Sequence, residues 1–311
     1  MRVIYMGTPD FAVGALEEII KAGHEVALVV TQPDKPKGRG NVMMQTPVKE
    51  CALAHGIPVY QPNRVREKAV IEEIKAQNPD VIIVIAFGQI LPKEILEAPR
   101  YGCINIHASL LPKYRGAAPI QWAVINGEKI TGVTTMQMDT GIDTGDILEQ
   151  VTMKLDPKET GGSLFDKLSK MGGKLLLSTL DRAEAGTLQP IKQQEELASH
   201  ARILNKQTGH IDFQKSAAEI ERLIRGLNPW PSAFTHVDGK LLKIWDAEVL
   251  PDEEGADEKP GTVVKSDKNG LYIATGDGIL SVVCLQLEGK KRMDVRSFLA
   301  GYTVPQGTVL V

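Results

Sequence analysis

The chain has few cysteines. Its 311 residues include three of them, Cys51, Cys103 and Cys284, which lie far apart and form no Cys-x-x-Cys pair. This distribution argues against a disulfide framework and against a zinc site, so we expect no metal. Cys103 lies in an apolar run and is expected to pack rather than to react. Unpaired cysteines are typical of a reducing compartment, and we therefore expect a cytoplasmic protein.

Long apolar runs are also absent. No stretch reaches the ~20 apolar residues that span a bilayer, and the N-terminus lacks the features of a signal peptide. We therefore expect no membrane association. Neither sign of charge dominates, because 36 Lys and Arg residues stand against 39 Asp and Glu residues, for a formal net charge of −3. A nucleic acid would thus be bound by a local basic segment rather than by the whole surface.

Two common catalytic motifs are missing as well. The loop Gly7–Phe11 follows the first expected strand, where dinucleotide-binding folds carry a Gly-x-Gly-x-x-Gly motif, but it lacks that spacing and contains Pro9. This disfavours a nicotinamide or flavin cofactor. There is also no Gly-x-Ser-x-Gly motif and no cysteine paired with a histidine by motif. The sequence therefore favours direct group transfer without a covalent enzyme intermediate.

The sequence does contain a regular alternation of strand patterns and helix patterns. Strands are expected at 2–6, 26–30, 58–60, 81–86 and 103–107, and helices at 12–22, 48–55, 69–77 and 119–126. A polar loop is expected at 31–46, a strand pair at 132–138 and 146–153, and a helix at 163–185. This alternation predicts an α/β domain with a Rossmann-like parallel sheet and helices on both sides.

The pattern changes in the last third of the chain. Residues 187–209 are polar and aperiodic, as in a linker, and Ser216 with Glu219 forms a capping box at the start of a helix. Short strand patterns follow Pro229-Trp230-Pro231 and predict a small β-barrel, OB-like domain. The expected division is a catalytic domain at 1–188, a linker at 189–208 and the β-barrel domain at 209–311.

The densest group of chemically useful residues surrounds the expected strand 103–107. Strand alternation sends Asn105 and His107 to the same face, and Asp143 lies in the glycine-flanked turn 139–145. The plainer interpretation is a buried Asn and His that only satisfy backbone groups. The strand end of an open α/β sheet is, however, where ligands usually bind. A carboxamide, an imidazole and a carboxylate can together stabilise a developing oxyanion and handle a proton.

Two loops are expected to line the same cleft. One follows the strand 103–107 and contains two adjacent leucines, which are unusual in an exposed connection, and the other follows the strand 81–86. An apolar pocket with a few backbone polar groups suits an aromatic heterocycle. The candidate residues are Ser109, Leu110, Leu111 and Pro112 in the first loop, and Phe87, Gly88 and Ile90 in the second.

Three segments together resemble a known family. They are Asn105-Ile106-His107-Ala108-Ser109-Leu110-Leu111-Pro112, Arg115-Gly116-Ala117-Ala118-Pro119-Ile120-Gln121, and Met138-Asp139-Thr140-Gly141-Ile142-Asp143-Thr144-Gly145-Asp146. In these segments the chain is similar to the 10-formyltetrahydrofolate-dependent formyltransferases. Three further segments resemble the branch of this family that acts on tRNA. They are Gly7-Thr8-Pro9-Asp10-Phe11-Ala12, the loop from Thr31 through Gly40, and Asn228-Pro229-Trp230-Pro231.

The resemblance implies a reaction and a set of residues. A formyl group would pass from the cosubstrate 10-formyltetrahydrofolate to the α-amino group of methionine on initiator methionyl-tRNA, for translation initiation. The resemblance implies that Asn105, His107 and Asp143 are catalytic and that Ser109–Pro112 bind the folate. Asn105 and a protonated His107 would donate hydrogen bonds to the oxyanion, while Asp143 holds His107 charged and helps remove the amine proton. The family is usually monomeric, so a monomer is implied as well.

The polar loop 31–46 is unusually long for a connection between a strand and a helix. The resemblance implies that it wedges into the acceptor end of the tRNA, with Arg39 as the principal contact and Lys35 and Lys37 beside it. Met43 and Met44 would pack either against an unstacked base or against the body of the protein.

The second domain carries little basic charge. Its residues from Gly209 onward are slightly acidic in sum, and Lys290-Lys291-Arg292 is its one compact basic cluster. Contacts with tRNA there are expected to be local. Lys206, in the expected linker, is a further candidate tRNA contact.

Three alternatives stay open at the level of sequence. The first is a formyltransferase that acts on an amino sugar or a nucleotide. The second is a folate-binding hydrolase or oxidoreductase domain, in which water or a hydride acceptor replaces the amine. The third is a tRNA-binding module with a decayed catalytic core, against which the intact Asn105, His107 and Asp143 argue.

Overall fold

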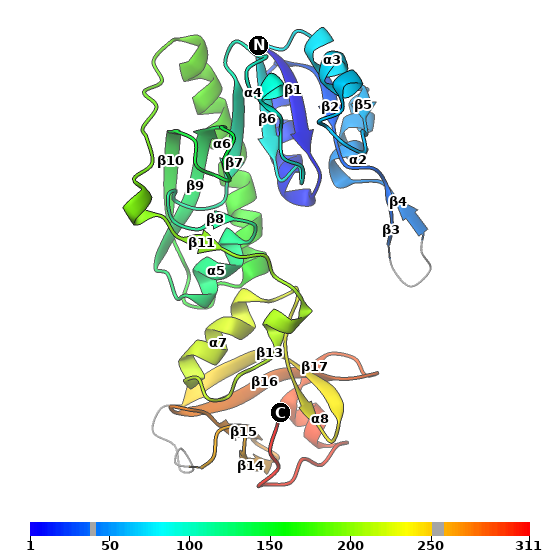
Figure 1. Ribbon diagram of the computed structural model, residues 1–311. Coiled ribbons are helices and arrows are strands. Elements are labelled where there is room, and N and C mark those ends of the chain that lie inside the picture. Colours follow the sequence, from blue (N-terminus) through cyan, green and yellow to red (C-terminus); the bar gives the residue numbers. More distant parts are fainter. Residues whose placement is uncertain (38–41, 251–257) are drawn as a thin grey trace. The chain divides into compact units, whose positions relative to one another are not determined.

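The computed structural model describes residues 1–37, 42–250 and 258–311, which form two compact units (Figure 1). Both units are discontinuous in sequence. The first contains Met1–Pro119, Ile130–Lys154 and Phe165–Ala201, and the second contains Ile120–Lys129, Leu155–Leu164 and Arg202–Val311.

The first unit is built on a seven-stranded sheet. Hydrogen bonds join its strands in the order β10-β9-β7-β6-β1-β2-β5. The strands are β1 Arg2–Gly7, β2 Glu25–Val30, β5 Val59–Tyr60, β6 Val81–Ile85, β7 Cys103–His107, β9 Ile130–Gln137 and β10 Ile147–Lys154. The strands from β7 to β5 in this order run parallel, whereas β9 is antiparallel to both β7 and β10. The expected α/β class with a mostly parallel sheet is confirmed.

Helices cover both faces of this sheet. They are α1 Val13–Lys21, which follows the 3-10 turn η1 Asp10–Ala12, then α2 Pro47–Ala54, α3 Lys68–Ala76, α4 Lys93–Leu96 and α6 Gly161–Glu184. Helices α3 and α4 share a core with Ile82 and Val84 on one face. On the other face α6 approaches so closely that a Cβ on Gly172 would lie 2.9 Å from Ile106 Cγ2. Every residue of β6 is therefore buried, as its unbroken apolar run predicts.

The segment 31–46 is predicted from its composition to be a polar loop, but its described residues include two paired strands. Strand β3 Lys35–Lys37 pairs antiparallel with β4 Val42–Met44. A hydrogen bond of 2.8 Å between the Thr31 and Thr46 hydroxyls closes its base. Lys49 forms a 2.6 Å ion pair with Asp34 beside it, and hydrogen bonds, first that from Lys49, lower the pKa of Asp34. The hairpin is thus anchored at its base, and its apolar β4 side chains are exposed.

The second unit contains a six-stranded antiparallel sheet, in agreement with the expected β domain. The order is β12-β13-β16-β15-β14, with β17 paired to β16. Its elements are α5 Pro119–Ile125, α7 Ala217–Gly226, β12 Ala233–Val237, β13 Lys240–Leu250, β14 Val263–Asp267, β15 Gly270–Ala274, β16 Ile279–Leu287, β17 Met293–Asp294 and α8 Val295–Leu299. The capping box of Ser216 and Glu219 opens α7, as the sequence predicts.

The polar segment 187–209 divides between the units after Ala201. Its regular pieces are the 3-10 turn η2 Glu195–Leu197, the strand β11 His200–Ala201 and the 3-10 turn η3 Lys206–Gly209. Strand β11 pairs in parallel with β8 Arg115–Gly116, and the amide of Arg115 donates to the Ser199 carbonyl at 2.8 Å. The first part of the segment therefore belongs to the first unit.

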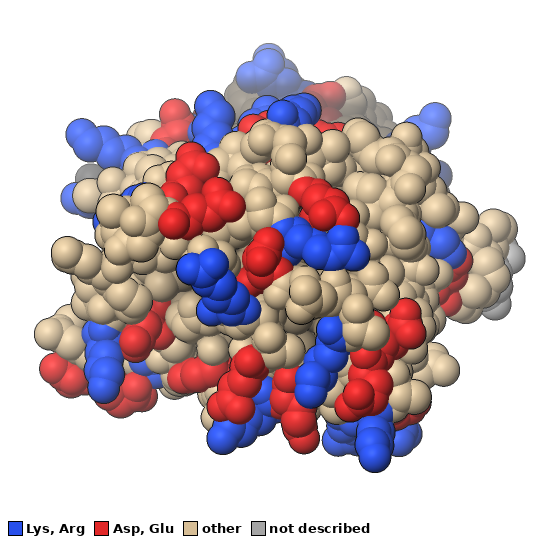
Figure 2. All heavy atoms as spheres, turned by 90° about the horizontal axis from the view of Figure 1, so that it is seen from above, with Lys and Arg blue, Asp and Glu red and all other residues tan. Residues whose placement is uncertain are grey.

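The surface charges are mixed. Figure 2 shows the molecule from above, where acidic and basic side chains lie next to one another without a broad area of either sign. This is what the formal net charge of −3 leads one to expect. Within residues 1–37, 42–250 and 258–311, none of the helices has the length and apolar character needed to cross a membrane.

Candidate active site

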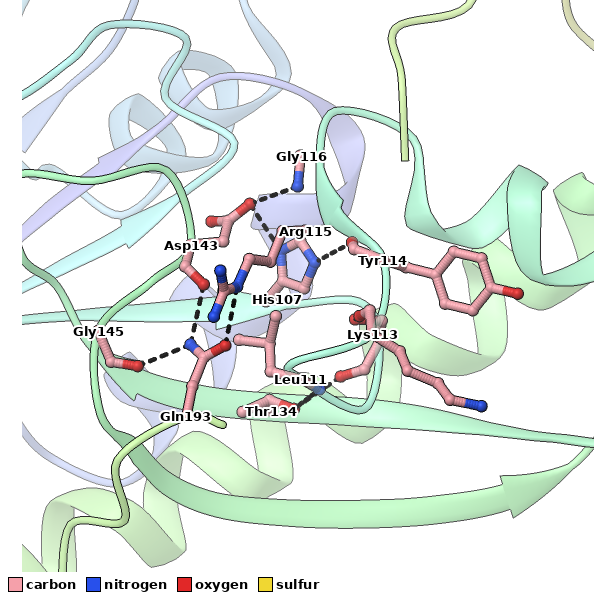
Figure 3. Close-up of polar contacts among 11 residues, drawn as sticks. His107, Leu111, Lys113, Tyr114, Arg115, Gly116, Thr134, Asp143, Gly145 and Gln193 are labelled. Carbon is pink, nitrogen blue, oxygen red and sulfur yellow. Dashed lines mark hydrogen bonds and ion pairs between the residues drawn. The ribbon is translucent and has the colours of Figure 1, made fainter. Parts of the chain in front are cut away.

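His107 and Asp143 come together at the carboxyl end of β7 (Figure 3). His107 is the last residue of β7, and Asp143 lies in the turn between β9 and β10. The Nδ1 atom of His107 is 3.5 Å from Oδ2 of Asp143, and its Nε2 atom is 2.8 Å from the backbone carbonyl of Tyr114. Both side chains are largely buried, with 7% and 15% of their surfaces exposed.

Both ring nitrogens of His107 face oxygen atoms of the protein. A carbonyl oxygen can only accept, so Nε2 must carry a hydrogen toward Tyr114. A neutral ring would then turn the lone pair of Nδ1 toward the Asp143 carboxylate. A ring with a hydrogen on both nitrogens would instead turn Nδ1–H toward the carboxylate. The site thus places an imidazole beside a fixed carboxylate at the end of a buried strand.

The Asp143 carboxylate is held by backbone geometry. Asp143 has a φ of 54°, in the left-handed region that side-chain-bearing residues rarely adopt. Its Oδ2 atom accepts a 2.7 Å hydrogen bond from the amide of Gly116. At Gly145, a Cβ atom would lie 1.7 Å from the Gln137 carbonyl oxygen, so only glycine fits there. The turn is therefore a constrained structure that aims one carboxylate at His107.

Asn105 offers a free carboxamide on the same strand. It lies two residues before His107 on β7, so strand alternation places both side chains on one face. Asn105 is 9% exposed. In the described part of the chain, its side chain has no hydrogen-bond partner. A buried amide without a protein partner is available to a bound molecule.

The loop Ser109–Pro112 is fixed by polar side chains of the neighbouring strands. The hydroxyl of Thr134 on β9 donates to the Ser109 carbonyl at 2.6 Å and accepts from the Leu111 amide at 3.1 Å. Gln150 on β10 donates to the Leu111 carbonyl at 2.9 Å. These backbone groups are therefore engaged within the protein and shape the loop.

The two leucines of this loop differ in their surroundings. Leu111 is buried in a small cluster with Met136 and Ile147, so it anchors the loop to the sheet. Leu110 and Pro112 are only partly buried. The Ser109 hydroxyl donates to the carbonyl of Lys113 at 2.6 Å and closes the turn.

The loop after β6 is the second loop that was expected to line the cleft, and it contains one core residue and one exposed residue. Phe87 is 2% exposed and packs in the main core, while its carbonyl accepts from Thr8 and Gln32, each at 3.1 Å. Gly88 has a φ of 84°, which explains the glycine. Ile90 is 79% exposed and lines a hollow of about 460 Å³.

The candidate tRNA contacts lie apart from this constellation in the chain. Lys35 and Lys37 are on β3 of the hairpin, and Lys35 is exposed. Arg39 lies outside the described residues. Lys206 is exposed in η3 and belongs to the second unit.

Two groups in the site escaped the sequence reasoning. The first is the backbone carbonyl of Tyr114, for which a side-chain pattern gives no signal. The second is the pair Arg115 and Gln193, in which Arg115 Nε donates to Gln193 Oε1 at 3.0 Å. Arg115 is 2% exposed, an unusual burial for arginine that sequence pattern does not reveal.

Cys103, the cysteine of β7, is not suited to act as a nucleophile. Cys103 opens β7, and burial raises the pKa of its thiol to about 12. A thiol with so high a pKa is a poor nucleophile at neutral pH. The prediction that Cys103 serves packing is therefore supported by its surroundings.

Comparison with known proteins shows the family to which the chain belongs. Residues 1–180 match the formyl transferase family, and residues 203–303 match the formyl transferase C-terminal domain. The chain is 62% identical over 309 residues to the methionyl-tRNA formyltransferase of Agathobacter rectalis, with 99% of both chains covered. It is 60% identical over 313 residues to that of Lachnospira eligens, with 100% of this chain and 99% of the other covered. The chain belongs to the methionyl-tRNA formyltransferase family.

Solved structures agree with this membership at the level of the fold. A sugar 3N-formyl transferase, WlaRD, matches with a TM-score of 0.67 and 21% identity over 94% of this chain and 99% of the other. The HypX protein of Aquifex aeolicus matches with a TM-score of 0.63 and 19% identity over 96% of this chain and 47% of that one. The formyltransferase family predicted from the sequence motifs is confirmed, and so is its activity class, an enzyme of formyl transfer.

Proposed function

We propose that the protein transfers a formyl group from 10-formyltetrahydrofolate to the α-amino group of methionine on initiator tRNA, and so serves translation initiation. The observation that carries this proposal is the 62% identity, over 99% of the chain, to a methionyl-tRNA formyltransferase. The geometry of His107, Asp143 and Asn105 supports it, because these residues suit a reaction that passes through an oxyanion.

A folate is the formyl donor in this proposal. The HypX structure was determined in complex with tetrahydrofolic acid, and a Helicobacter canadensis N-formyltransferase of the same fold was determined with folinic acid. The donor would lie against the loop Ser109–Pro112 and the segment from Phe87 to Ile90. Leu110 and Pro112 are only partly buried there and can contact an apolar ring.

The reaction begins when the methionyl amine attacks the formyl carbon. The carbonyl oxygen then gains negative charge, and two donors stabilise it. One is the carboxamide of Asn105, which has no partner among the described residues. The other is Nδ1–H of His107, because its 3.5 Å contact with Asp143 is too long to be a good hydrogen bond, whereas Nε2–H is used by Tyr114. Asp143 keeps the ring charged.

One proton leaves the attacking nitrogen before the bond between the formyl carbon and N10 breaks. The attacking nitrogen becomes positively charged and loses one proton, which Asp143 accepts directly or through a water molecule. The tetrahedral species then collapses, the bond to N10 of the folate breaks, and N10 takes up the proton that Asp143 had accepted. The net result is a formylated amine and tetrahydrofolate, with no proton gained or lost by the enzyme and no covalent enzyme intermediate.

The hairpin β3–β4 is the proposed contact for the tRNA acceptor end. Val42, Met43 and Met44 are 65%, 61% and 45% exposed, so they do not pack against the body of the protein. Exposed apolar side chains beside the exposed Lys35 suit a splayed nucleic-acid strand, with bases on the apolar side chains and phosphates on the lysine. Arg39, Lys37 and Lys206 complete the proposed set.

The rest of the assignment follows from the same proposal. The chain would act as a cytoplasmic monomer, with a catalytic domain at 1–188, a linker at 189–208 and a tRNA-binding domain at 209–311. Size-exclusion chromatography with light scattering checks the monomer.

One assay tests the proposed function. Purified protein is incubated with 10-formyltetrahydrofolate and methionyl initiator tRNA, and formylmethionyl-tRNA is measured. His107→Ala and Asp143→Asn are expected to lower turnover at least about a hundredfold but to leave a measurable rate. His200→Ala, which removes an exposed imidazole on β11, is expected to leave turnover intact. Absence of product with the wild-type protein would overturn the proposal.

The main rival uses the same fold and a different acceptor. The Helicobacter canadensis enzyme was determined with dTDP-3-aminofucose, at 21% identity to this chain. Incubation with an amino-sugar nucleotide in place of tRNA separates the two. Formylation of the sugar but not of the tRNA would decide for the rival, and formate released without an acceptor would indicate a hydrolase.

A further inference from the structure

Gln193 connects the first part of the expected linker to the turn that carries Asp143. Its Nε2 atom donates to the backbone carbonyl of Asp143 at 2.8 Å and to that of Gly145 at 2.7 Å (Figure 3). The turn between β9 and β10 is thus held from outside by a single carboxamide on a segment fifty residues further along the chain.

The orientation of this carboxamide is set by a buried arginine. Arg115 Nε can only donate, so the atom 3.0 Å from it must be the oxygen of Gln193. The amide nitrogen then faces the two carbonyls. Arg115 is itself held by a 2.8 Å ion pair with Glu195, whose side chain is 78% exposed. The three side chains therefore form one chain of contacts that ends at the Asp143 turn.

The turn needs such support because of its backbone conformation. Asp143 adopts a φ of 54°, which residues with a side chain rarely do. The carboxylate of Asp143 receives a hydrogen bond from the Gly116 amide, and Gly116 lies on β8 beside the same polar segment. If the carbonyls of Asp143 and Gly145 lost their shared donor, the turn could relax and carry the carboxylate away from His107.

We propose that Gln193 is a positioning residue, which acts through Asp143 by locking the backbone of the 139–145 turn. This inference rests on the proposed function for its effect on turnover. Gln193 touches neither His107 nor the reacting atoms, so its loss lowers kcat without a matching change in the KM for either substrate.

The test compares Gln193→Met with Gln194→Met. Methionine keeps the length of the side chain and removes its donor. Gln194 is the neighbouring, exposed glutamine, and its side chain makes no hydrogen bond within the described residues. Gln193→Glu is the second variant, since it keeps the oxygen toward Arg115 and replaces the donor with an acceptor. The readouts are kcat, both KM values, the thermal midpoint, and hydrogen exchange of the Gly116 amide, which reports the hydrogen bond to Asp143.

For Gln193→Met and Gln193→Glu we expect kcat to fall about tenfold or more, with both KM values within about twofold, as for a misplaced catalytic group. The Gly116 amide should exchange faster than in Gln194→Met, and the thermal midpoint should stay above the assay temperature, so that the lower kcat belongs to folded protein. In an Asp143→Asn background, Gln193→Met should add no further loss. Turnover and Gly116 exchange equal to those of Gln194→Met would overturn the inference, as would a loss confined to KM. Full turnover of Asp143→Asn alone would instead refute the proposed role of Asp143, and Gly116 exchange would still decide whether Gln193 holds the turn.

Discussion

Replacing Thr134 with valine tests how the loop after β7 is held. Thr134 is fully buried on β9. Its hydroxyl donates to the Ser109 carbonyl at 2.6 Å and accepts from the Leu111 amide at 3.1 Å and from Gln150 Nε2 at 3.0 Å. Valine has nearly the same shape, so the packing is kept while all three hydrogen bonds are lost.

The expected cost follows from the groups that lose their partner. Gln150 keeps its bond to the Leu111 carbonyl, so the Ser109 carbonyl and the Leu111 amide are the two backbone groups left unpaired. Each buried unpaired group costs about 1–3 kcal/mol, and the added methyl group offsets roughly 0.8 kcal/mol. We therefore expect the free energy of unfolding to fall by about 3 kcal/mol.

Urea denaturation and the KM for the formyl donor measure the two consequences. If the loop moves to regain hydrogen bonds with water, the KM for the donor should rise about tenfold, the equivalent of ~1.4 kcal/mol. Thr131→Val is the matched control, because Thr131 is buried three residues earlier on β9 and its hydroxyl has no bond to other described residues. A Thr134→Val protein with the urea midpoint and donor KM of Thr131→Val would refute the reasoning.

Three further perturbations have defined outcomes. Burial raises the pKa of Glu149, but hydrogen bonds, first that from Thr179, outweigh burial and lower the pKa. The free energy of unfolding, measured in urea at pH 7, should therefore be about 1 kcal/mol larger for the wild type than for Glu149→Gln. This difference should be lost as the pH falls below about 4.3. Gly145→Ala places a Cβ 1.7 Å from the Gln137 carbonyl oxygen, so the turn must shift and kcat should fall about tenfold or more without global unfolding. Met43→Ser should raise the KM for methionyl-tRNA about fivefold, as for ~1 kcal/mol of apolar contact, and leave the KM for the formyl donor unchanged.

Each of these expectations can fail in a recognisable way. A constant difference between wild type and Glu149→Gln from pH 7 to 3 would show that the carboxylate does not contribute through its charge. Unchanged kcat in Gly145→Ala would mean that the turn adapts without moving Asp143. An unchanged tRNA KM in Met43→Ser would remove β4 from the proposed tRNA contact.

Much of the first unit could be predicted from sequence because its signals are local. The apolar run of β6 and the glycines that end the early helices specify their elements directly. The pairing of β3 with β4 could not be predicted, because the prolines, glycines and lysines of the segment 31–46 are typical of a loop. The pairing is stabilised by contacts at its base, between Thr31 and Thr46 and in the ion pair of Asp34. The antiparallel direction of β9 against β7 likewise depends on tertiary pairing.

The residues of the candidate site could likewise be predicted only where their sequence signal is local. His107 and Asp143 could be brought together from a strand end and a glycine-flanked turn, and the structure places them 3.5 Å apart. Gln193 could not, because its segment is polar and aperiodic and its role depends on Arg115, a contact 78 residues apart in sequence. Leu111, a predicted folate contact, packs with Met136 and Ile147. Sequence alone does not give this contact, since an apolar side chain looks the same in sequence whether it faces a core or a pocket.

The central claim is that a charged His107, held by Asp143, stabilises the oxyanion of formyl transfer. Single-turnover formylation of methionyl-tRNA, with enzyme in excess, tests it most directly because product release does not contribute. For His107→Ala we expect a rate at least about a hundredfold below that of His200→Ala, as for the loss of an oxyanion donor. A rate equal to that of His200→Ala would contradict the claim.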